Sequence, residues 1–132
     1  MASLTQDMKE MIAAQQCFYA TVSRDCMPNN APKRSTRVLN DETLVFSEGT
    51  GGTTYRNILD GSKVAVAVVN RETLDGYRFL GTPEVFTTGE IYDIAAERSL
   101  SAGMPKPKAV ILVHIYEIHS LRPGPMAGKK IS

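Results

Sequence analysis

Cationic side chains, hydroxyls and glycines are concentrated between Pro28 and Ile58. The run Lys33-Arg34-Ser35-Thr36-Arg37 places three cations next to two hydroxyls. Further along, the glycine-rich loop Gly49-Thr-Gly-Gly52 leads into Thr53-Thr54-Tyr-Arg-Asn57. Cations, hydroxyls and the free N–H groups at the start of a helix are the groups that bind phosphate in proteins. The stretch therefore predicts a phosphate-binding site.

Two strands and a short helix are expected to position these groups. The first strand is predicted from Asn30 to Leu39, and the second from Thr43 to Ser47 after a turn at Asn40-Asp41. The helix should open at Thr53 or Thr54, with a threonine as its cap.

Alternation along the first strand would sort the side chains of residues 33–37 onto two faces. One face would carry Lys33, Ser35 and Arg37, and the other Arg34 and Thr36. Two cations with a hydroxyl between them suit a dianion such as phosphate.

Each half of this pattern also has a plain structural interpretation. Charged residues discourage aggregation on an edge strand, and Pro32 favours an edge or a bulge. The glycine-rich loop is not a Walker A motif, because no Gly-Lys-Ser/Thr follows, and an ordinary loop with a helix cap would look the same. Only the two segments together favour phosphate.

The rest of the chain predicts a mainly β protein, a six-stranded antiparallel barrel with flanking helices, as a single domain over residues 1–132. A first helix should bury Leu4, Met8, Met11 and Ile12 on one face. The other predicted elements are strands at 17–23, 63–69, 76–88 and 109–119 and a helix at 92–102. Gly81 and Pro83 would bend the strand that contains them.

Composition excludes several classes of function. The formal net charge of +1 argues against binding nucleic acid through bulk electrostatics. The sequence lacks an apolar run long enough to cross a membrane and the pattern of a signal peptide, so we expect a cytoplasmic protein. Cys17 and Cys26 are expected to be free thiols.

No side chain is nominated as a catalytic acid, base or nucleophile. His114 and His119 have no acidic or cysteine cluster with metal-ligand spacing around them, so no metal site is expected. Asp93, Glu97 and Arg98 are interpreted as a solvated helix face. Residues 122–130 are expected to form a mobile loop, which includes Lys129 and Lys130.

Several short segments match one known family in order and spacing, although no single one is specific. They are Ala20-Thr-Val-Ser with Asp25, Pro28-Asn29, Ala31-Pro32-Lys33, Val38 to Phe46, Thr54-Tyr-Arg-Asn57, Val64 to Val68, and Gly76 to Thr82. Together with the first helix, they resemble the FMN-binding split-barrel proteins related to pyridoxamine 5′-phosphate oxidase. The resemblance covers roughly residues 4–90, and the last strand fits it too.

The resemblance implies a homodimer that holds FMN non-covalently at the subunit interface. By analogy, the phosphate and ribityl chain would contact Lys33, Arg34, Ser35, Thr36, Thr53, Thr54 and Asn57. Ser47, Glu48 and Gly49 would pass near the isoalloxazine. The implied role is a flavin oxidoreductase or a small electron-transfer flavoprotein, in which the flavin carries the chemistry.

Three departures from the family pattern matter. Cys26 replaces a usual turn glycine. Thr53 replaces a basic residue of the phosphate site in many relatives, which leaves Arg37 or Arg56 to supply that charge. The chain also has no Trp and lacks the C-terminal Trp- and Arg-containing substrate motif, so oxidation of pyridoxamine 5′-phosphate itself is not expected.

Two other functional classes remain open. One is a non-enzymatic protein that stores or senses flavin, or that binds another planar cofactor such as haem or a deazaflavin. The other is a structural dimer whose cofactor site has decayed. A decayed site would lose its cations first, and Lys33 to Arg37 retains them.

Overall fold

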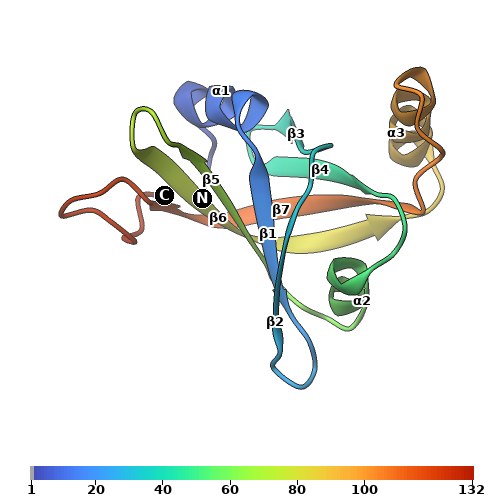
Figure 1. The fold of residues 1–132 in the computed structure, drawn as a ribbon, viewed down its shortest axis with the longest axis horizontal. Helices are drawn as coiled ribbons and strands as arrows, with labels where there is room; N and C mark the ends of the chain where they lie inside the picture. The colour runs from blue at the N-terminus through green and yellow to red at the C-terminus, as the bar shows by residue number, and fades with distance from the viewer. Residues whose placement is uncertain (1) are drawn as a thin grey trace.

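A computed structural model describes residues 2–132 (Figure 1). Its strands pair in antiparallel fashion in one sheet of order β2-β1-β5-β6-β7-β4-β3. The strands are β1 (Cys17–Val22), β2 (Pro28–Pro32), β3 (Arg37–Asn40), β4 (Thr43–Glu48), β5 (Val64–Asn70), β6 (Asp75–Phe86) and β7 (Ala109–Ser120). The helices are α1 (Gln6–Ala14), α2 (Thr53–Leu59) and α3 (Glu90–Ser101). The predicted domain includes Met1, which lies outside the described residues.

The inner face of the curved sheet encloses the main core. Tyr19, Phe46 and Phe79 are fully buried there, and the ring centroids of Tyr19 and Phe46 lie 4.5 Å apart. Helix α1 contributes Met8 and Ile12 to this core, as its predicted apolar face requires. These contacts confirm the mainly β architecture with flanking helices.

A second, smaller cluster lies between the sheet and α3. Ala95 of α3 packs there against Val45 of β4 and against Val110 and Leu112 of β7. Strands β4 and β7 are therefore buried on both faces, which explains the nearly continuous apolar run of β7. Figure 1 shows α3 at one end of the molecule, well separated from α1.

The predicted strand from Asn30 to Leu39 is wrong, and it accounts for the predicted count of six strands instead of the seven observed. The chain forms β2 against β1, turns at residues 33–36, and then forms β3 against β4. A hydrogen bond from the Thr36 N–H to the Lys33 carbonyl, 3.2 Å long, closes this turn. We call residues 33–36 the crossing turn, because they carry the chain from one edge of the sheet to the other. Since these residues form a turn, their predicted alternation between two faces is also wrong.

Strand β6 is continuous but irregular at Gly81, as predicted. Its pairing with β7 shifts between Leu80 and Gly81, which is the signature of a bulge. A Cβ atom placed on Gly81 would lie 2.3 Å from Cγ1 of Val113 and 3.2 Å from the carbonyl oxygen of His114. Only glycine fits this contact between neighbouring strands.

Replacing Gly81 with alanine should therefore destabilise the barrel. Forcing a methyl group into a packed site costs about 1–3 kcal/mol, so the free energy of unfolding in urea should fall by that amount. Gly49→Ala is the matched control, because a Cβ there has no neighbour within 4 Å. Equal unfolding midpoints for the two variants would contradict the close approach at Gly81.

Candidate functional site

The crossing turn is hydrogen-bonded to β1 and to β4, the strands next to the two edge strands β2 and β3. On one side, the Lys33 N–H donates to the carbonyl of Cys17 in β1 over 3.1 Å. On the other side, the Ser35 hydroxyl accepts from the Ser47 N–H at 2.8 Å and donates to the Ser47 carbonyl at 3.3 Å. The Ser35 side chain thus satisfies both backbone groups of Ser47, as a neighbouring strand would.

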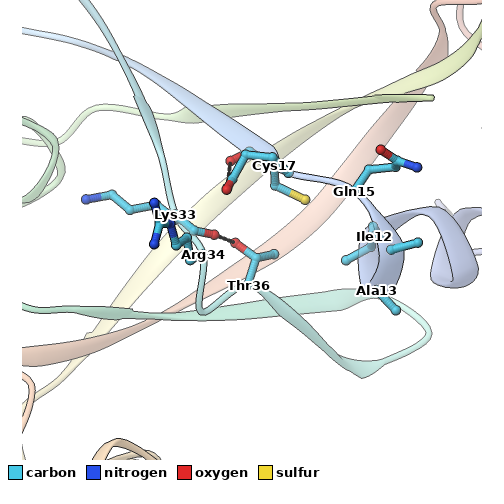
Figure 2. Close-up of a pocket in the computed structure, with 9 residues that line it drawn as sticks. Ile12, Ala13, Gln15, Cys17, Lys33, Arg34 and Thr36 are labelled. Atoms are coloured by element: carbon cyan, nitrogen blue, oxygen red, sulfur yellow. Dashed lines mark hydrogen bonds between the residues drawn. The ribbon is translucent and has the colours of Figure 1, made fainter. Parts of the chain in front are cut away.

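Thr36 is the inward-facing member of the turn. Its hydroxyl is hydrogen-bonded to the Tyr19 hydroxyl at 3.0 Å and donates to the Lys33 carbonyl at 2.7 Å; the second bond is drawn in Figure 2. Burial raises the pKa of Tyr19 well above its ordinary value, so this phenol stays neutral. Thr36 is therefore occupied in holding the turn to the core.

Lys33 forms a largely buried ion pair with Glu48. Its Nζ lies 3.0 Å from Oε1 of Glu48, and the two side chains are only 16% and 5% exposed. The other carboxylate oxygen accepts a long hydrogen bond, 3.4 Å, from the Gly51 N–H. Lys33 Nζ also lies 5.6 Å from the centre of the Phe46 ring. In Figure 2 the Lys33 side chain extends away from Ile12 and Ala13 of α1.

A groove of about 610 Å³ separates α3 from the crossing turn and β4. Three kinds of side chain line it. The cations are Lys33, Arg34, Arg37 and Arg98; the apolar residues include Pro32, Val45, Phe46, Ala95 and Met104; and the small polar group comprises Ser35, Ser47 and Ser99, with Gly49. The groove therefore joins an apolar wall to a cluster of positive charge.

The arginines of this groove lack acidic partners within residues 2–132. None of Arg34, Arg37 and Arg98 belongs to an ion pair there, whereas Lys33 does. The pKa of Arg37 is lowered, first by its burial and then by the positive charge of Arg98. An anion bound beside Arg37 and Arg98 would relieve this repulsion, so the groove is suited to an anionic ligand.

Of the ten predicted site residues, the groove brings together Lys33, Arg34, Ser35, Ser47 and Gly49. Glu48 adjoins it through Lys33. Thr36, by contrast, lies on the other side of the turn.

Helix α2 does not bring its predicted site residues Thr54 and Asn57 to the groove. Thr54 is buried and accepts a hydrogen bond from the Asn29 amide at 3.1 Å. Asn57 is buried too, and its amide donates to the Thr21 hydroxyl at 3.1 Å. These side chains fasten α2 to β1 and β2, and neither of them lines the groove.

The predicted threonine cap of α2 is wrong. The N-cap is Gly52, which has no side chain to form a capping hydrogen bond, and Thr53 is the exposed first residue of the helix. Thr53 also does not line the groove.

Arg98 was missed by sequence reasoning, which interpreted it as part of a solvated face. It lies on α3, and Ala95 of the same helix and its C-cap residue Ala102 also line the groove. The available signal was the spacing of three and four residues between these positions, which places them on one side of a helix. Two small residues beside a cation leave room for a ligand.

A smaller cavity of about 250 Å³ lies between the end of α1 and the crossing turn (Figure 2). Lys33, Arg34, Thr36 and Cys17 contribute to its lining. Cys17 is 1% exposed, and burial raises the pKa of its thiol to about 11. Cys17 and Cys26 are both free, and Cys26 is exposed.

No group of three or more metal-ligating side chains is found within residues 2–132. Over the same residues, none of the helices is both long and apolar enough to span a bilayer.

Comparison with known proteins assigns the chain to a family. The family model described as pyridoxamine 5′-phosphate oxidase matches residues 4–122. The chain belongs to this family. An uncharacterized protein of Methanocaldococcus jannaschii is 35% identical over 133 residues, which covers 98% of this chain and 88% of that protein.

Solved structures agree with this placement. The crystal structure of HupZ from Group A Streptococcus is 42% identical, with a TM-score of 0.85, and the match covers 95% of this chain and 99% of that one. An FMN-binding protein from Syntrophomonas wolfei is 21% identical, with a TM-score of 0.72 over 86% of this chain and 82% of that one. The likeness at this lower identity shows the shared fold alone, and it confirms the predicted split barrel.

The two cysteines should differ sharply in reactivity. At pH 8, a thiol with a pKa of about 11 is ionised in only about one molecule in a thousand, and the thiolate is the reactive form. A disulfide reagent at pH 8 should therefore label Cys26 quickly and leave Cys17 unmodified until the chain is unfolded in urea. Cys26→Ser is the control, and rapid labelling of this variant in its native state would contradict the burial of Cys17.

Proposed function

We propose that the protein binds FMN non-covalently in the groove between α3, β4 and the crossing turn, and that it acts as an electron-handling flavoprotein. The observation that carries the proposal is the placement of Arg34, Arg37 and Arg98, without acidic partners in the described chain, beside an apolar wall. A ligand with a planar apolar ring and a phosphate matches both surfaces. The FMN-binding relative with the same fold adds support.

The residues present fit such a cofactor in size and in charge. Cofactor sites commonly enclose about 300–1,000 Å³, and the groove of about 610 Å³ lies within that range. Arginine offers a planar array of donors that matches a phosphate. Ser35 is less available to the phosphate, because its hydroxyl already bonds both backbone groups of Ser47.

The structure favours Arg37 over Arg56 as the substitute for the basic residue that Thr53 replaces. Arg37 lines the groove together with Arg34 and Arg98. Arg56 lies exposed on α2, outside the lining of the groove. We therefore assign Arg37 to the phosphate of the proposed cofactor.

When bound, FMN would supply the electron or hydride transfer, and the protein would supply binding, orientation and electrostatics. Arg34, Arg37 and Arg98 would hold the phosphate end. Pro32 and Met104, exposed apolar residues of the groove, would contact the ring system and exclude water from it. Ser47 and Gly49 would border the ring, and no catalytic side chain is assigned.

We also propose a homodimer with the cofactor at the subunit interface. The outer face of β1, β5 and β7 carries large apolar side chains that remain 43–54% exposed, namely Phe18, Val22, Val69 and Tyr116. An apolar surface of this kind is typical of a subunit interface. A cytoplasmic location belongs to the same proposal and rests on the sequence alone.

The proposal predicts that FMN binds more tightly than riboflavin, because only FMN carries the phosphate. A hydrogen bond to a charged group contributes about 1.5–3 kcal/mol, so FMN should bind at least about tenfold more tightly in a fluorescence titration. The purified protein should also show flavin absorption near ~370 and ~450 nm. A haem or deazaflavin spectrum would mean that the protein binds that cofactor instead of FMN. Equal affinities for FMN and riboflavin would refute the phosphate site.

Arg37→Gln should weaken FMN binding by about 1.5–3 kcal/mol and leave riboflavin binding unchanged. Arg56→Gln is the matched control, since it removes the same charge from an exposed position outside the groove. The two variants should be compared by titration with both flavins. Equal losses of FMN affinity would show that the phosphate does not bind beside Arg37.

We expect the bound flavin to accept electrons without oxidising pyridoxamine 5′-phosphate. Holding a second phosphate in place for hydride transfer can be worth ~7–11 kcal/mol of barrier, and the C-terminal residues do not provide that anchor. They run back along β7, where the Ser120 N–H donates to the Lys129 carbonyl and the Ile131 N–H donates to the Ile118 carbonyl. This end of β7 is opposite Ala109, which pairs with Glu48 beside the groove.

The measurement is an anaerobic reduction with dithionite or a reduced nicotinamide, run beside an assay for pyridoxal 5′-phosphate. Reduction without product formation is the expected result. Robust turnover would overturn this prediction and make Arg78 or Lys129 the next residue to replace, as the anchor of the second phosphate.

A further inference from the structure

We infer that Glu48 determines how strongly the groove prefers phosphorylated over unphosphorylated ligands, because its carboxylate competes with the ligand's phosphate for Lys33. The inference rests on the proposed function, and it concerns a residue that the resemblance placed only near the flavin ring. It makes Glu48 a specificity-determining residue of the groove.

The contact itself is the first support. Lys33 is the one cation of the groove that has an ion-pair partner within residues 2–132, at 3.0 Å from Glu48. Both side chains are largely withdrawn from water, which weakens screening of the pair by solvent and salt. The positive charge of Lys33 is thus already matched before any ligand enters.

The backbone of Glu48 is fixed by the start of β7 and the residue before it, which limits how far the carboxylate can follow Lys33 toward a ligand. Glu48 pairs with Ala109 in β7, and its carbonyl oxygen accepts from the Lys108 N–H at 2.8 Å. The Lys108 side chain also lies against Gly51, where an added Cβ would meet its Cδ at 2.8 Å. The loop that follows Glu48 is therefore confined as well.

A phosphate that draws Lys33 away would leave Glu48 with a single long hydrogen bond, from Gly51. A carboxylate that is 5% exposed and has lost its cation is unfavourable in a protein interior. This loss opposes binding of the phosphate. Arg34, Arg37 and Arg98 have no carboxylate partner of this kind within residues 2–132. An anion that binds to them therefore leaves no buried carboxylate without its cation.

Removing the charge of Glu48 should therefore strengthen selection for phosphate. In Glu48→Gln, the amide oxygen can still accept from Lys33, but the negative charge is gone. We expect the ratio of FMN affinity to riboflavin affinity to rise about tenfold above that of the wild-type protein, the scale of a charge-assisted hydrogen bond.

Two further variants make the test specific. Glu97→Gln removes the same charge from an exposed position on α3, and should change neither affinity by more than about twofold. The double variant Glu48→Gln/Lys33→Gln should lose the gain in FMN affinity, because the competition acts through Lys33. A gain that survives in the double variant, or an equal gain in Glu97→Gln, would overturn the inference.

Glu48→Asp covers the case in which Glu48→Gln fails to fold. It keeps the charge but withdraws the carboxylate by one methylene group, so the ratio of FMN to riboflavin affinity should rise by an intermediate amount. An unchanged or lower ratio in the variant that folds would refute the role of Glu48.

Inorganic phosphate separates this inference from the proposed function. If the wild-type protein binds neither flavin, the proposed function fails. Calorimetric titration with phosphate then decides the role of Glu48: tighter binding to Glu48→Gln than to Glu97→Gln supports the competition, and equal binding or none overturns it.

Discussion

The closure of the barrel depends on a single crossing of the chain. β2 and β3 are consecutive in sequence but lie on opposite edges of the sheet, so the residues between them must span the gap between β1 and β4. Residues 33–36 do so with hydrogen bonds to Cys17 on one side and to Ser47 on the other. Backbone groups of a strand need hydrogen-bond partners, and here one short turn supplies them to Cys17 of β1 and to Ser47 of β4. The rest of the sheet is an ordinary antiparallel series.

The same turn also provides the chemistry of the groove. Because Ser35 and Thr36 are held by Ser47 and Tyr19, the neighbouring cations Lys33 and Arg34 are carried on a rigid support. Rigid support reduces the entropy that a ligand must overcome to order its binding residues. The hydrogen bonds of the crossing turn therefore both connect β1 to β4 and position the cations of the groove. Lys33 belongs to both, since its backbone bonds to β1 and its ammonium group to Glu48.

Local patterns in the sequence were sufficient to predict the helices and strands whose buried residues are periodic or continuous along the chain. The apolar face of α1, the central strand β5 and the bend of β6 at Gly81 were all predictable in this way. The break of the strand at residues 33–36 was not, because nothing local shows that β2 pairs with β1 and β3 with β4. The side chains of Thr54 and Asn57 are of types that can bind phosphate. In the structure they form hydrogen bonds with Asn29 and Thr21 instead, which come from distant segments of the sequence. Arg98 was missed for the same reason, since only tertiary structure brings α3 beside Arg37.

The two walls of the groove differ in how they are held. The wall formed by β4 and the crossing turn is continuous with the main core through Phe46. The wall formed by α3 rests on the smaller cluster around Ala95 and on a hydrogen bond from the Tyr92 hydroxyl to the Pro107 carbonyl, 2.7 Å long. Elements with fewer buried contacts open at a lower free energy than the core. An anion that joins Arg98 to Arg37 would connect the weaker wall to the stronger one, and binding would stabilise α3 more than any other part of the fold.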